Sequence, residues 1–129
     1  MGLFDILPQG NPYIIENRYI YNGDFMAEIK ENVELNKETK KKFKIIAAQE
    51  GVSMRDLLLT ETKSIIQEDA EIPIREREKE ENRSSLIINV PIEFKDDVRL
   101  FVNTHDIKIR DLWVESVDRI IKRYDNVQN

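Results

Sequence analysis

The chain of 129 residues has no cysteine, one histidine, and only four glycines and four prolines. The absence of cysteine excludes disulfides, thiolate metal sites and a cysteine nucleophile. One histidine alone does not supply a zinc site, so we expect no bound metal and no cofactor. A chain without cysteine also fits the reducing cytoplasm.

Long apolar runs are missing as well. No stretch approaches the roughly 18 apolar residues of a membrane span. The first residues lack the basic start and the long apolar core of a signal peptide. We therefore expect a cytoplasmic protein without a membrane partner.

Enzyme motifs are the third absence. The chain has no glycine-rich phosphate loop, no nucleophile elbow and no plausible catalytic triad, so we expect no enzymatic activity. What the chain does contain is 35% charged and 40% hydrophobic residues. With so few glycines and prolines, this balance is typical of a helix-rich protein with a solvated surface.

An internal repeat is visible when the chain is compared with itself at an offset of 55 residues. Without a gap, 33–38 aligns with 88–93, and 52–58 aligns with 107–113. Both copies contain Arg-Asp-Leu, and apolar positions fall on apolar positions. A chance similarity between two helix pairs is the alternative, but the ungapped register favours a duplication.

The repeat predicts the organisation of the whole chain. We expect an N-terminal aromatic arm at 1–27, a first unit at 28–68, a charged linker at 69–83, a second unit at 84–124 and a tail at 125–129. The linker is expected to be a solvated spacer, long enough to bring the second unit back beside the first.

The second copy has the pattern of one strand followed by two helices. The apolar run 86–90 ends at Pro91, a residue that stops a strand and can start a helix. Apolar residues at helical spacing then predict a helix, a break at 103–106 and a second helix over about 108–123.

The first copy repeats this plan. A strand is predicted around 33–35, followed by a helix over about 37–50. Gly51 is a typical residue for the end of a helix. Ser53 is a typical N-cap, and it predicts another helix over about 54–67.

Neither copy is expected to fold by itself. A unit of about 40 residues cannot bury its own apolar faces, and a lone strand leaves its backbone groups without partners. We therefore predict a mainly α fold with a short antiparallel β-ribbon, in which the two units form an intramolecular pseudo-dimer. The protein would be a monomer, or a homodimer if two chains exchange units.

The strand, the helix that starts at a proline, and Arg-Asp-Leu at the start of the next helix resemble the ribbon-helix-helix superfamily of Arc-type and Met-repressor-type proteins. Two units in one chain resemble its tandem members among plasmid-transfer and partition proteins. The resemblance covers 29–67 and 84–123. It implies sequence-specific binding of double-stranded DNA by a β-ribbon in the major groove, in transcriptional regulation, plasmid partition or conjugation.

The resemblance also implies roles for individual residues. Alternate ribbon side chains would face the core, namely Val33, Leu35, Leu86, Ile88 and Val90. The intervening side chains would read bases, namely Lys30, Asn32, Glu34, Ser85, Ile87 and Asn89. The starts of the second helices would bind phosphate, namely Ser53, Met54 and Arg55, and Lys108, Ile109 and Arg110. Helix N-termini attract anions through their N–H groups and dipole.

Some residues depart from the family pattern. Glu31 stands where the family has an apolar residue, which predicts a shortened first strand. Glu34 and Ile87 are poor hydrogen-bond donors in a major groove, whereas Asn32 and Asn89 can pair with adenine.

The net charge of −5 favours an alternative function, because DNA-binding proteins usually present a basic face. The chain would then be a protein-interaction module that keeps the fold without binding DNA. The acidity lies outside the units, since 28–68 and 84–124 each sum to zero. The arm, which holds five aromatic residues, would order on a protein partner or pack over the core.

Other residues have two interpretations. Arg55 and Arg110 each precede an aspartate, so a local ion pair is the alternative to a phosphate contact. The lysines within 40–44 fit either a phosphate contact or a solvated helix face. His105 is expected to be a solvated loop residue, and Trp113 a core residue.

Overall fold

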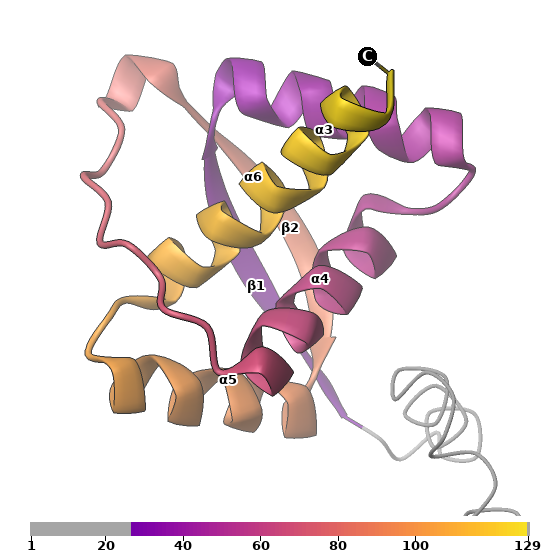
Figure 1. The fold of residues 1–129 in the computed structure, drawn as a ribbon. Helices are drawn as coiled ribbons and strands as arrows, with labels where there is room; N and C mark the ends of the chain where they lie inside the picture. The colour runs from indigo at the N-terminus through magenta and orange to yellow at the C-terminus, as the bar shows by residue number, and fades with distance from the viewer. Residues whose placement is uncertain (1–26, 129) are drawn as a thin grey trace, which may run out of the picture.

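The computed structural model describes residues 27–128, so the predicted arm lies outside the described residues except for Ala27. In chain order the elements are β1 (Glu28–Asn36), α3 (Lys37–Glu50), α4 (Met54–Glu68), the short 3₁₀-helix η2 (Glu80–Asn82), β2 (Arg83–Pro91), α5 (Ile92–His105) and α6 (Ile109–Gln128). As predicted, the fold is mainly helical with a two-stranded antiparallel sheet (Figure 1). Within the described part of the chain, no helix is both long and apolar enough to cross a membrane.

The elements repeat at the offset seen in the sequence. β2 begins and ends 55 residues after β1, α5 does so after α3, and α6 begins 55 residues after α4. In the antiparallel register, Asn32 lies opposite Ile87, its own counterpart at that offset. A local two-fold axis of the ribbon therefore passes through this pair.

Side chains along both strands alternate between the core and the outside. The residues predicted to face inward are all buried, namely Val33, Leu35, Leu86, Ile88 and Val90. The helices cover this inner face of the ribbon, with α6 crossing it and α3 and α5 at its two ends (Figure 1). Trp113 is 1% exposed, so its predicted place in the core is confirmed.

Both copies contribute to one core. α3 of the first copy packs against α6 of the second, and α4 packs against both α5 and α6. The buried hydroxyls of Thr62 and Ser116 lie 2.7 Å apart and join α4 to α6 by a hydrogen bond. Because buried residues of all these elements form a single cluster, neither copy has a separate hydrophobic interior.

Local signals place the helix ends. The Asn36 side chain caps α3, and Ser53 caps α4 by accepting a 3.0 Å hydrogen bond from the backbone N–H of Asp56. Gly51 ends α3 with φ 69°, a left-handed conformation that glycine adopts without a steric penalty. These ends agree with the predicted helices, whereas α5 continues through the predicted break to His105.

β1 is longer than predicted, because Glu31 does not interrupt it. Glu31 lies at an inward position, and its carboxylate pairs with the Lys95 ammonium of α5. The two side chains are only 13% and 8% exposed. This ion pair stands where an apolar residue was expected, and the strand runs for nine residues.

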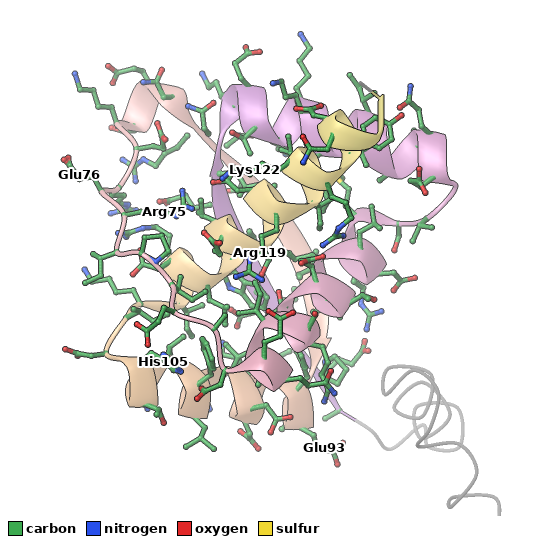
Figure 2. All side chains as sticks on the ribbon, in the orientation of Figure 1. Arg75, Glu76, Glu93, His105, Arg119 and Lys122 are labelled. Carbon is green, nitrogen blue, oxygen red and sulfur yellow. The ribbon has the colours of Figure 1, made fainter. Side chains whose placement is uncertain are left out.

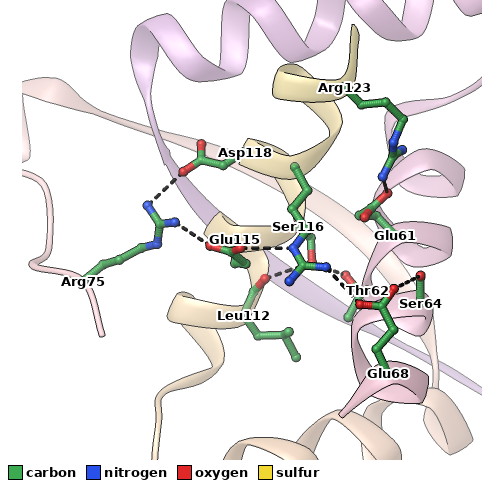
Figure 3. A network of polar contacts seen from close by, with 11 residues as sticks. Glu61, Thr62, Ser64, Glu68, Arg75, Leu112, Glu115, Ser116, Asp118 and Arg123 are labelled. Carbon is green, nitrogen blue, oxygen red and sulfur yellow. Dashed lines mark hydrogen bonds and ion pairs between the residues drawn. The ribbon is translucent and has the colours of Figure 1, made fainter. Parts of the chain in front are cut away.

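The segment between the copies is mostly exposed, as expected, but it is not a free spacer. Ile72 is buried in the core. Arg75 pairs with Glu115 at 2.6 Å and with Asp118 at 2.8 Å, and both carboxylates belong to α6 (Figure 3). The linker is therefore fastened to α6 on its way to η2 (Figure 1).

His105 is also not a solvated loop residue. It is the last residue of α5 (Figure 2), and its side chain is 10% exposed. The ring stacks on Phe101 with centroids 4.1 Å apart, and Nε2 lies 2.7 Å from a carboxylate oxygen of Asp69 at the end of α4. The histidine thus joins the last turns of two helices.

We predict that Lys95→Met destabilises the fold, because Glu31 would keep its charge at a mostly buried position without a partner. Breaking a buried ion pair typically costs about 3–5 kcal/mol. Since some exposure remains here, we expect a loss of about 2–3 kcal/mol in a urea unfolding experiment.

The matched control is the double substitution Glu31→Val with Lys95→Met, which makes the site apolar. It should recover most of the lost stability. A double variant as unstable as the single one would show that the unpaired carboxylate is not the cause.

Candidate nucleic-acid interface

The outer face of the ribbon carries the six residues predicted to read bases. We call this set the ribbon strip: Lys30, Asn32, Glu34, Ser85, Ile87 and Asn89. The register makes its members direct neighbours, with Lys30 opposite Asn89, Asn32 opposite Ile87, and Glu34 opposite Ser85. Opposed residues of antiparallel strands have Cβ atoms about 4.5–5.5 Å apart, so the strip is one continuous surface. All of its residues are exposed except Glu34, which is half-buried.

The start of α4 lies beside one end of the ribbon strip. Arg55 donates from Nε to the backbone carbonyl of Asn89 at 2.7 Å, and its Nη2 lies 3.1 Å from the carboxylate of Glu28. Met54 packs partly into the core, and Ser53 is held by its capping bond. The predicted phosphate-binding trio of the first copy is thus anchored next to Asn89, one of the residues predicted to read bases.

The start of α6 lies beside the other end. Ile109 and Arg110 border a hollow of about 180 Å³ together with Asn32 and Glu34 of β1. The backbone N–H of Lys108 donates to the Asp111 carboxylate at 2.9 Å. Both predicted phosphate sites therefore flank the ribbon strip, one at each end.

The two arginines of these sites have different partners. Arg55 also lies 3.1 Å from Asp56, so the local ion pair considered from the sequence is present. Arg110 donates to the backbone carbonyl of Arg75 at 3.1 Å. Asp111 accepts a hydrogen bond from the backbone N–H of Arg75 at 3.0 Å. These two contacts of Arg75 place the linker over part of the start of α6.

Glu34 is neutralised by two arginines that sequence reasoning missed. Arg77 donates from Nε and Nη2 to the two carboxylate oxygens, both at 2.9 Å, and Arg83 approaches within 3.5 Å. The hydrogen bond from Arg77 is the largest cause that lowers the pKa of Glu34 to about 2. Two guanidinium groups therefore contact the one carboxylate of the ribbon strip, while Glu78 contacts Asn36 and Glu80 acts on Arg77 at the same end.

The lysines of α3 were predicted either to contact phosphate or to form a solvated helix face, and they differ in their surroundings. Lys40 donates from Nζ to the backbone carbonyl of Ser85 at 2.6 Å, which places it at the ribbon. Lys41, Lys42 and Lys44 are exposed along α3. Only Lys40 is thus held against the ribbon by a described contact.

No protein-family model matches this chain, and no curated protein or solved structure is significantly similar to it. Among the residues from 27 to 128, no three acidic or histidine side chains are grouped to hold a metal ion. The function therefore has to be inferred from the ribbon strip and its surroundings.

We predict that Arg77→Gln raises the pKa of Glu34 from about 2 toward its ordinary value of 4.5. The variant loses the charge-assisted hydrogen bonds that favour the ionised carboxylate. An NMR pH titration that follows the Glu34 side-chain carboxyl carbon would measure the change. Arg99→Gln is the matched control, because Arg99 lies near Asp96 on α5 and does not contact Glu34.

The ion pair between Arg77 and Glu34 also predicts how the free energy of unfolding depends on pH. A carboxylate whose pKa is lowered by folding contributes stability that is fully present above pH 4.5 and is lost as the pH falls through about 2. The stability difference between wild type and Arg77→Gln should therefore shrink over this window. A Glu34 pKa unaffected by Arg77→Gln would contradict both expectations.

Proposed function

We propose that this chain is a sequence-specific double-stranded DNA-binding protein that places its two-stranded ribbon in the major groove. The observation that carries the proposal is the ribbon strip, flanked at each end by the start of a helix. A two-stranded ribbon has a size that the major groove admits. Asn32 and Asn89 supply amides that can pair with adenine, and Lys30 supplies a donor for guanine.

We infer that the two copies form a ribbon-helix-helix pseudo-dimer within the single chain. The matching element boundaries, the pairing of Asn32 with its counterpart Ile87, and the shared core support this inference. The counterpart of Glu34 at the offset of 55 is Asn89. Since counterparts differ chemically, the preferred DNA target should not be a clean palindrome.

Phosphate contacts would come from the helix starts at the two ends of the ribbon strip. Free N–H groups and the helix dipole attract anions there, and Arg55 and Arg110 stand in the first turns of α4 and α6. Such contacts position a protein on DNA without reading sequence. Arg77 and Arg83 offset the negative charge of Glu34, the one acidic residue of the ribbon strip.

The resemblance to the ribbon-helix-helix superfamily suggests the process. A tandem protein of this type would act as a transcriptional regulator or as an accessory protein in plasmid partition or conjugation. Selection from a pool of random duplexes, followed by electrophoretic shift assays at low and moderate salt, tests the proposal directly. Failure to bind any duplex at low salt would overturn it and favour the protein-interaction module, for which the 63% exposed Ile87 is the supporting observation.

We predict that Asn89→Ala weakens specific DNA binding by about 1–3 kcal/mol, the value of a good bidentate base contact. Folding should change by no more than about 0.5 kcal/mol, because Asn89 is exposed. Shift assays and thermal melting measure the two quantities. Asn103→Ala, an exposed asparagine on α5, is the matched control. Unchanged affinity and base preference in Asn89→Ala would rule out its role in base reading.

We predict that Arg110→Ala weakens binding by a similar factor for every DNA sequence, because a phosphate contact positions without specifying. The slope of log affinity against log salt should fall by about one contact. Arg99→Ala on α5 is the control that removes a charge away from the ribbon strip. A changed base preference with the same salt slope would contradict the phosphate assignment.

A further inference from the structure

A groove of about 230 Å³ lies between the last turn of α4 and the second half of α5. Its apolar lining comes from Ile66, Leu100 and Phe101, with Asp69 and His105 also along it. Leu100 is 68% exposed, and its counterpart at the offset of 55, Ile45, is 51% exposed. The groove is smaller than the roughly 300–1,000 Å³ of small-molecule sites, so it suits a single side chain better than a ligand.

The repeat places an equivalent site between α3 and α6, the counterparts of α5 and α4 at the offset of 55. At the offset of 55, Leu100 corresponds to Ile45, and Asp69 corresponds to Tyr124. Tyr124 of α6 packs against the core, and its hydroxyl donates to the side chain of Gln49 on α3. An aromatic ring of the chain itself thus lies between α3 and α6.

The groove of the other half has no such ring from its own helix. α4 ends at Glu68, and its C-cap Asp69 adopts a left-handed conformation with φ 54°, where the chain turns away. α6 instead continues through the corresponding position to Gln128. In this half the His105 ring of α5 covers Phe101 and contacts Asp69, and the groove remains along Ile66, Leu100 and Thr104.

The chain enters the described structure beside the start of α5, and the second half of the same helix lines the groove. The Ala27 carbonyl accepts a 3.3 Å hydrogen bond from the backbone N–H of Ile92, at the start of α5. Ile92 and Leu100 are both exposed, and eight residues of helix separate them by about 12 Å along the axis. The six-residue step from Tyr21 to Ala27 spans up to roughly 20 Å, so Tyr21 and Tyr19 are both within reach.

We propose that the groove binds an aromatic side chain from residues 1–26 of the same chain, Tyr19 or Tyr21, in the place that Tyr124 takes in the other half. Apolar contact would come from Ile66, Leu100 and Phe101. The phenol hydroxyl would find a partner in Thr104, the counterpart of Gln49 at the offset of 55. This docking does not depend on DNA binding.

Hydrogen exchange on the full chain tests the proposal. Amides within residues 19–25 should exchange about tenfold more slowly than in an unstructured peptide, because docking must open before they exchange. Leu100→Lys should abolish this protection. Ile45→Lys is the matched control, since it puts the same change at the exposed counterpart position on α3. Thermal melting verifies that both variants fold.

A second measurement identifies which side chains occupy the groove. Tyr19→Ser with Tyr21→Ser should lower the melting temperature of the wild type but not that of Leu100→Lys. Absence of protection in the wild type, or equal protection in Leu100→Lys, would overturn the docking. Protection that persists without both tyrosines would overturn their assignment. Protection that rises with protein concentration would show that a second copy supplies the segment, and would overturn docking within one chain.

Discussion

The pairing of β1 with β2 is the constraint on which the rest of the structure depends. Each strand belongs to a different copy of the repeat, and neither can satisfy its backbone hydrogen bonds alone. Pairing them turns five apolar side chains toward one side, and the helices of both copies are needed to cover that side. The same alternation puts the polar residues of both strands on the opposite surface. The core and the candidate interface are therefore two faces of one ladder of hydrogen bonds.

Charged side chains then hold the surrounding segments to this ribbon and to α6. Glu31 and Lys95 tie α5 to β1, and the arginines of the linker bind carboxylates on β1 and α6. Exposed ion pairs contribute little individually. Here several converge on neighbouring groups, and their role is to place the linker beside the ribbon strip. The charge of the strip is therefore set partly by a segment outside both copies.

The sequence predicted what depends on neighbours along the chain. Gly51 and Ser53 located the gap between two helices, and the alternation in the strands separated buried from exposed residues. It did not predict pairs that tertiary structure creates. Lys95 is 64 residues from Glu31, and Arg77 is 43 residues from Glu34. A pattern shows that such residues are charged but not what they face, so the long first strand and the neutralised Glu34 could not be foreseen.

Because the two copies belong to one chain, a substitution can change one copy without changing the other. In a symmetric dimer of identical chains, every substitution appears twice, so a change that improves one side is also imposed on the other. Here Glu34 and Asn89 occupy equivalent places with different chemistry. Mutation can therefore alter one half of the outer surface while the other half keeps its contacts. The covalent link also makes assembly unimolecular, so the ribbon forms equally well when only a few copies are present in a cell.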